Sequence, residues 1–228
     1  MLHHPQRQVQ DAAAALLMLP GTLCDARLYG AVLENLRVPA LVAALQGACS
    51  TQQMAQLILA SAPPRMSLCG FSLGAIVALE IIAQAPWRVD RLALIACNPG
   101  LFDETARRAR AALQQSEFVQ PDDAPLVHLM AREATAETYR QQTQMTLDRA
   151  DSRPRLGRIN VPTLVLCGAE DRICPPAMSR AIADAIAMSR LTIVPGAGHY
   201  LPIERPELVA EQLAGWLAMP AHTEKEPT

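Results

Sequence analysis

Ser72, in the pentapeptide Gly70-Phe71-Ser72-Leu73-Gly74, carries the hydroxyl of this sequence that is best placed for nucleophilic chemistry. The pentapeptide follows a short apolar run at residues 66–69 and precedes a long apolar, helix-like stretch at residues 75–85. A serine between two glycines at a strand-to-helix turn is the nucleophile-elbow pattern, which lifts the hydroxyl above the sheet. The glycines are needed because the strand and helix backbones pass too close for a side chain. We predict that Ser72 is a nucleophile and that Leu73 N–H, at the helix start, donates to a substrate oxyanion.

A hydroxyl nucleophile needs a general base, and His199 is the candidate. It lies in the loop at residues 196–202, directly after the last predicted strand, and the flanking glycines let this loop turn tightly. A loop at the carboxyl end of a strand can bring the imidazole over Ser72. The remaining histidines lie in the tails or in a helical segment, which makes them poorer candidates: His3, His4, His128 and His222.

Asp171 is the candidate for the acid that orients the imidazole and stabilises its charged form. It follows the predicted strand at residues 163–168, so it also lies at the carboxyl end of a strand. Glu170 is the neighbouring alternative, and Asp103, after the preceding strand, is another.

The loop after the first predicted strand is expected to supply a second backbone donor to the oxyanion. Gly21 allows the backbone to approach closely, so Thr22 N–H is the first choice and Leu23 N–H the alternative. Asp25 follows in the same loop, where it is expected to cap a helix rather than to take part in catalysis.

Strands and helices alternate along most of the chain, which predicts an α/β fold with a mostly parallel sheet flanked by helices. About six strands are expected, at residues 13–19, 40–45, 66–69, 91–97, 163–168 and 191–194. Helices are expected at residues 26–36, 50–62, 75–85, 176–187 and 206–217. The second of these helices begins at Ser50, because Ser50 and Gln53 have the spacing of a capping box.

The segment at residues 101–158 breaks this alternation with helical patterning alone, at residues 103–115, 124–133 and 136–149. An insertion between two sheet strands lies over their carboxyl ends, where open α/β sheets bind ligands. We therefore predict a lid over Ser72; the alternative is a packing insert remote from the site. Apolar side chains of the lid and elbow are candidates for a substrate pocket, or equally for the lid's own core: Phe71, Phe118, Leu126, Leu129, Met130, Tyr139 and Met145.

The composition fits one large domain, with a core at residues 13–100 and 159–218 and flexible ends at residues 1–12 and 219–228. Half of the 228 residues are hydrophobic, and no apolar run reaches the length of about 18 residues that a membrane span needs. A net charge of −2 gives no reason to expect nucleic acid or an anionic membrane as a partner. The six cysteines form no metal-binding pattern, so we expect structural thiols, no metal and a cytoplasmic protein.

These motifs together resemble the α/β-hydrolase superfamily over residues 13–218. The matching pieces are Leu19-Pro20-Gly21-Thr22, the pentapeptide around Ser72, Gly168-Ala169-Glu170-Asp171, and Gly198-His199 followed by Glu204-Arg205-Pro206. The chain order of Ser72, Asp171 and His199 is the order of this superfamily. Within it the sequence looks like the small, lidded esterases, which include pimeloyl-carrier-protein methyl ester esterases and 3-oxoadipate enol-lactonases.

The resemblance implies hydrolysis of a small to medium acyl ester, thioester or lactone through a Ser72 acyl-enzyme, without metal or organic cofactor. Acyl transfer or C–C bond hydrolysis by the same residues, or small-molecule binding without catalysis, are the alternatives. The lid segment has nine arginines and nine acidic residues, so no net basic surface favours a carrier protein. The run at Arg107, Arg108 and Arg110 would suit an anionic substrate or carrier, or a solvated helix face.

The sequence departs from the superfamily pattern at its start. Members have His-Gly where this chain has Pro20-Gly21, and they begin with a strand hairpin that 12 residues cannot supply. The strand at residues 40–45 would then be an exposed apolar sheet edge. We predict that a second copy of the chain, in a homodimer, or the N-terminal segment covers it.

Overall fold

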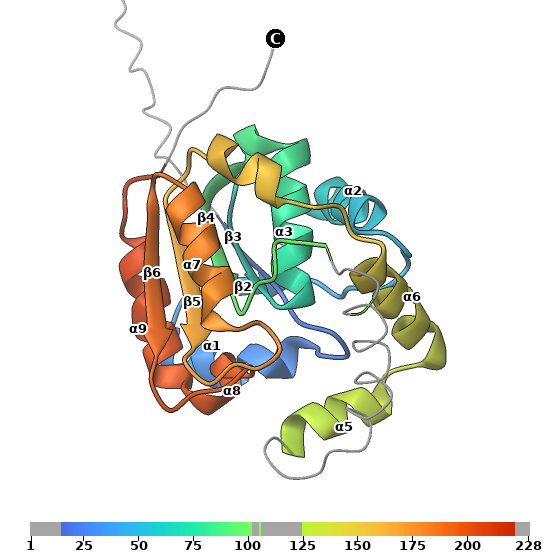
Figure 1. Ribbon diagram of the computed structural model, residues 1–228. Helices are drawn as coiled ribbons and strands as arrows, with labels where there is room; N and C mark the ends of the chain where they lie inside the picture. Colours follow the sequence, from blue (N-terminus) through green and yellow to red (C-terminus); the bar gives the residue numbers. More distant parts are fainter. Residues whose placement is uncertain (1–14, 102–104, 106–124, 222–228) are drawn as a thin grey trace, which may run out of the picture.

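A computed structural model describes residues 15–101, 105 and 125–221, and these form one parallel sheet between two layers of helices (Figure 1). The strand order is β2-β1-β3-β4-β5-β6, and every neighbouring pair is parallel. The strands are β1 (Ala15–Leu19), β2 (Ala40–Val42), β3 (Met66–Phe71), β4 (Val89–Ile95), β5 (Thr163–Gly168) and β6 (Ser189–Val194). The predicted fold class and the six strands are confirmed.

The inner strands are apolar along their whole length because both of their faces are covered. All six residues of β3 and of β5 are buried, whereas β6, at one edge, buries only Val194. Several predicted strand boundaries were wrong: the third strand continues to Phe71, the fourth ends at Ile95 and the sixth begins at Ser189. The strand expected at residues 40–45 pairs only at Ala40–Val42, and the fourth strand begins at Val89 rather than at residue 91.

Helices on the two faces pack against separate apolar clusters. One cluster holds α2 (Thr51–Ser61), α3 (Leu73–Gln84) and α7 (Pro176–Ala185) against the sheet. The other holds α1 (Gly30–Leu36), α8 (Leu201–Glu204) and α9 (Pro206–Leu217) on the opposite face. Three short 3₁₀ helices connect these elements: η1 (Ala26–Tyr29), η2 (Pro86–Arg88) and η3 (Arg153–Arg158).

Two helices begin at the N-cap residues that the sequence predicts. The Ser50 hydroxyl accepts from Gln53 N–H at 3.2 Å and begins α2, as its capping-box spacing predicts. The Asp25 carboxylate accepts from Arg27 N–H at 2.9 Å, so Asp25 caps a helix as expected. The helix predicted at residues 26–36 is divided into η1 and α1.

The described part of the 101–158 insertion contains α5 (Pro125–Glu133) and α6 (Ala136–Leu147), which Figure 1 shows together outside the sheet. Both helices reach the loop after β1. Asp25 N–H donates to Met130 Sδ of α5 at 3.4 Å, and Leu23 N–H donates to Gln142 Oε1 of α6 at 2.7 Å. The helix expected at residues 103–115 lies outside the described residues.

The outer side of β2 forms one edge of the sheet, and it is apolar. Leu41 of β2 is 51% exposed and Leu57 of α2 is 50% exposed. A hollow of about 270 Å³ lies between the two elements, lined by apolar side chains and Ser61. Within the described part of the chain, no strand pairs with this side of β2. None of the described helices has both the length and the apolar character that a bilayer crossing requires.

Candidate active site

Ser72 stands at a strained turn between β3 and α3. Its φ of 51° and ψ of −114° lie in a region that residues other than glycine seldom adopt. A Cβ at Gly70 would overlap Gly74 O, and a Cβ at Gly74 would overlap Leu19 O, so both flanking residues must be glycine. Ser72 N–H donates to Ile95 O at 2.9 Å, which ties the turn to β4. The strain is therefore supported by the sheet on both sides.

A continuous chain of hydrogen bonds joins Ser72, His199 and Asp171. His199 Nε2 lies 3.1 Å from Ser72 Oγ, and His199 Nδ1 lies 2.9 Å from Asp171 Oδ2. The second oxygen, Asp171 Oδ1, accepts from Ile173 N–H at 2.8 Å and from Cys174 N–H at 2.7 Å. These two backbone donors fix the orientation of the carboxylate.

The loops that carry Asp171 and His199 meet through backbone contact. A Cβ at Gly168 would overlap Gly198 O, so the approach of the two loops depends on glycine. The neighbouring Glu170 is exposed to solvent, and its backbone N–H donates to Ala197 O at 3.0 Å. Of the two adjacent acids, the structure brings Asp171 to the imidazole. The other alternative, Asp103, lies outside the described residues.

The hollow at Ser72 is bordered by two of the residues expected to donate a backbone N–H to an oxyanion. Thr22 and Leu73 both line it, and Leu73 begins α3, where the first N–H groups have no partner within the helix. Leu23 N–H instead donates to Gln142 Oε1. Of the two donors expected from the loop after β1, Thr22 is therefore the one at the hollow.

Gln142 is a buried polar residue that sequence reasoning missed. Its side chain bridges two loops, because Oε1 accepts from Leu23 N–H at 2.7 Å and Nε2 donates to Leu45 O at 2.8 Å. It is only 2% exposed. The available signal was its place three residues before Met145, on the same face of α6. A polar residue within an apolar helix face indicates a specific buried partner.

The hollow over Ser72 is small, at about 20 Å³. That is about the space that one water molecule needs. Its lining comes from the elbow, the insertion and the loop after β5: Thr22, Ser72, Leu73, Ile76, Asn98, Thr146, Arg149, Ile173 and Cys174. Arg149, another residue that the sequence did not single out, is 3% exposed, and its Nε donates to Gly100 O at 2.8 Å.

The residues expected to form a substrate pocket lie elsewhere in the structure. Phe71 is buried, with its ring centroid 5.2 Å from that of His199. Met130 and Met145 are buried in the two apolar clusters, and Leu129 is 47% exposed. Leu126 and Tyr139 are half-buried, and Phe118 lies outside the described residues. None of the described members of this set lines the hollow at Ser72.

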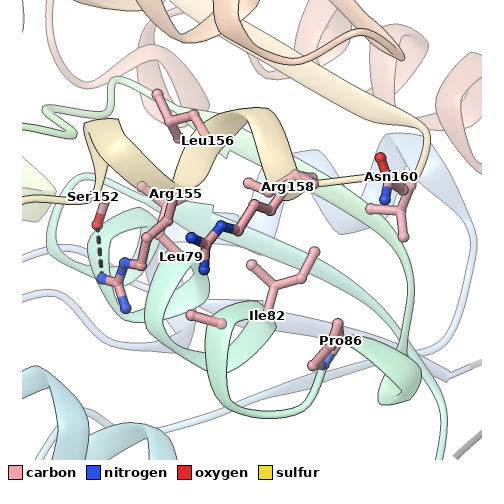
Figure 2. Close-up of a pocket in the computed structure, with 11 residues that line it drawn as sticks. Leu79, Ile82, Pro86, Ser152, Arg155, Leu156, Arg158 and Asn160 are labelled. Atoms are coloured by element: carbon pink, nitrogen blue, oxygen red, sulfur yellow. Dashed lines mark hydrogen bonds between the residues drawn. The ribbon is translucent and has the colours of Figure 1, made fainter.

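A larger cavity of about 170 Å³ lies between α3 and η3, away from Ser72 (Figure 2). Its wall includes Leu79 and Ile82, in the half of α3 remote from the elbow, and Arg158 extends over it. Arg155 is paired with Glu80 at 3.0 Å and donates to Ser152 Oγ at 3.3 Å. This cavity holds none of the residues of the hydrogen-bonded chain.

Buried thiols do not compete with Ser72 as nucleophiles. Burial raises the pKa of Cys24, Cys69 and Cys97 to about 12 each. These thiols stay protonated at neutral pH, and the thiolate is the nucleophilic form.

The chain belongs to the alpha/beta hydrolase family, whose model matches residues 13–212. This assignment agrees with the parallel sheet, the elbow and the hydrogen-bonded positions of Ser72, Asp171 and His199.

Proteins similar to this chain include several hydrolytic enzymes. A pimeloyl-[acyl-carrier protein] methyl ester esterase of Pectobacterium carotovorum is 26% identical over 193 residues, which cover 73% of this chain and 76% of the relative. A 3-oxoadipate enol-lactonase of Acinetobacter baylyi is 26% identical over 63% of this chain and 60% of its own. A thermophilic esterase from Thermogutta terrifontis has the same fold, with a TM-score of 0.76, 23% identity and coverage of 90% of this chain and 89% of that one.

Proposed function

We propose that this protein is a serine hydrolase that cleaves a carboxylic ester of a small to medium acyl substrate. The observation that carries the proposal is the hydrogen-bonded chain from Ser72 Oγ through His199 to Asp171, at 3.1 and 2.9 Å. A serine becomes a strong nucleophile when an adjacent base, itself held by a third group, can take its proton.

The mechanism follows from these contacts. His199 Nε2 takes the Ser72 proton as Oγ attacks the ester carbonyl, and Asp171 stabilises the imidazolium that forms. The N–H groups of Leu73 and Thr22 hold the oxyanion; losing one such donor costs about 10²–10³ in rate. His199 then protonates the leaving alcohol and activates water, which hydrolyses the acyl-enzyme.

The insertion at residues 101–158 acts as a lid in this proposal. Thr146 and Arg149 of the insertion are part of the wall of the hollow over Ser72. We expect α6 to move when substrate enters and leaves, and its closure to exclude water from the acyl-enzyme.

The proposal does not specify the acyl and alcohol groups of the substrate, and several related reactions are compatible with it. The similar proteins are named as a methyl ester esterase and an enol-lactonase, and both reactions expel an oxygen leaving group from an acyl carbon. The same residues would also serve thioester hydrolysis, acyl transfer or C–C bond hydrolysis, and binding without catalysis is the alternative from another class. The cytoplasmic location expected from the sequence also stays a prediction.

A fluorophosphonate probe and a panel of p-nitrophenyl esters test the proposal. We expect the probe to label the wild-type protein and not Ser72→Ala, and ester turnover to depend on Ser72. Absence of labelling, together with turnover no faster than that of Ser72→Ala, would contradict it. Comparing acyl chain lengths, lactones and carrier-bound esters then identifies the substrate class.

We propose that the open edge of β2 is covered by a second copy of the chain in a homodimer. The alternative is that the N-terminal segment covers this edge. The supporting features are the unpaired backbone on the outer side of β2, the exposed Leu41 and Leu57, and the hollow between them. Light scattering is expected to give twice the mass of one chain for the wild type and a monomer for Leu41→Glu. A wild-type monomer whose Leu41 is open to a solvent probe would contradict both modes of cover.

A further inference from the structure

Cys174 lies beside the hydrogen-bonded chain that includes Asp171 and His199. One ligand atom from each of Asp171, Cys174 and His199 lies within 4.8 Å of the other two, and all three residues are buried. Cys174 also lines the hollow at Ser72. The proposed hydrolytic mechanism uses the backbone N–H of Cys174, which holds Asp171, and leaves its thiol without a role.

A thiolate, an imidazole and a carboxylate are the ligands that Zn²⁺ takes in proteins. The bond lengths of a tetrahedral site place neighbouring ligand atoms about 3.3–3.8 Å apart, so donors that lie within 4.8 Å of one another need shifts of only about 1 Å to reach this spacing. Rotation of short side chains supplies shifts of this size.

We propose that Asp171, Cys174 and His199 form a binding site for a thiophilic divalent cation of the Zn²⁺ and Cd²⁺ class. On binding, the Cys174 thiol releases its proton to water and its thiolate bonds the cation. His199 gives the lone pair of one ring nitrogen, and Asp171 gives a carboxylate oxygen in place of its hydrogen bond to the imidazole. No group is oxidised or reduced. The cation gains three protein ligands, and the protein releases one proton.

Metal binding and ester hydrolysis exclude each other at this site. The imidazole that bonds the cation has lost its orientation by Asp171, and it no longer takes the Ser72 proton. The cation is therefore an inhibitor, and the thiolate of Cys174 raises the affinity with which it binds. Among the described residues, this is the one group of three such side chains with converging ligand atoms.

Cation binding is measured first without any use of enzymatic activity. Ser72→Ala keeps all three ligands, so titration with Cd²⁺ is expected to give a thiolate-to-metal charge-transfer absorption that saturates at one equivalent. Adding Cys174→Ser to it is expected to abolish the band and to weaken Cd²⁺ binding at least about 100-fold. Cys49→Ser is the matched control, because Cys49 is the exposed cysteine and lies outside this site.

An equal band in the Cys174→Ser protein would place the cation elsewhere and overturn the proposal. Loss of the band in Cys49→Ser instead would overturn it as well. Cys174→Ala, checked by its thermal transition, repeats the test should the serine variant fold poorly.

Inhibition is the second measurement, and it rests on the proposed function. Zn²⁺ is expected to inhibit ester hydrolysis by the wild type and by Cys49→Ser equally. The concentration for half inhibition, relative to each variant's own metal-free rate, is expected to rise at least about 100-fold in Cys174→Ser. Equal inhibition of all three proteins would assign the effect to His199 alone and overturn the proposal. A protein without Ser72-dependent turnover that still gives the Cys174-dependent Cd²⁺ band refutes the proposed function and leaves the cation site standing.

Discussion

The elbow and the insertion above it face each other across Ser72, and they are held in place by different kinds of contact. At the elbow, backbone meets backbone, since Gly74 lies against Leu19 O; the loops that carry Asp171 and His199 meet in the same way, at Gly168 and Gly198 O. In the insertion, single side chains reach across to the core, as Gln142 does to Leu23 and Leu45. The first arrangement is rigid because little can shift, whereas the second can open when a few hydrogen bonds break.

The largest effect is expected at Asp171, the acid that is hydrogen-bonded to His199. Asp171→Asn keeps the size of the side chain and removes the charge that stabilises the imidazolium, so kcat should fall about 10⁴-fold with the fold intact. Glu170→Gln is the matched control, because Glu170 is exposed, and its rate should stay within about twofold of wild type. Steady-state kinetics on one ester decides the matter. A loss in Glu170→Gln with Asp171→Asn active would reassign the acid.

Gly74→Ala tests the backbone contact of the elbow itself. The added Cβ would overlap Leu19 O in the sheet, so the strand and helix must separate. We expect a loss of about 3 kcal/mol of unfolding free energy, which lowers Tm by roughly 10 °C in a chain of this size. Gly215→Ala is the control: it lies within α9 with nothing within 4 Å of its Cβ, and it should stabilise by about 0.5–1 kcal/mol. Equal Tm values would show that the elbow is not tightly packed.

The sequence could predict the elbow region because its constraints are local. The need for glycine on both sides of Ser72, and the placement of Asp171 and His199 after apolar strands, are visible within short stretches of chain. The contacts of the insertion were not predictable in this way, since Gln142 bonds residues 119 and 97 positions away. An apolar lid residue such as Met145 has the same sequence pattern whether it lines a pocket or packs in a core. The structure buries it in the core cluster.

Gln142→Leu tests whether the insertion also positions the oxyanion loop. The change leaves the part-buried N–H of Leu23 and the buried carbonyl of Leu45 without their partner, and the buried carbonyl alone costs about 1–3 kcal/mol. Leu23 has a φ of 55°, so the loop that carries Thr22 is expected to relax once the bond is lost. We expect kcat to fall about tenfold, less than the loss of a whole oxyanion donor, with a smaller change in KM.

Gln144→Leu is the control for this prediction, because Gln144 is an exposed residue of the same helix. Its kcat should match that of the wild type. A Gln142→Leu protein with a lower Tm and an unchanged kcat would limit Gln142 to holding the lid.

The smallest effect is expected where the insertion meets the core at the surface. Arg27 Nη2 of η1 lies 2.5 Å from Glu133 Oε2 of α5, and their side chains are 38% and 55% exposed. Exposed ion pairs contribute about 0–1 kcal/mol, because water screens the charges and two long side chains must be held still. Glu133→Gln should therefore lower Tm by less than about 3 °C and leave kcat within about twofold. A larger change in kcat would mean that this ion pair, rather than the buried Gln142, controls the position of the lid, and added salt would then reproduce the effect of the substitution.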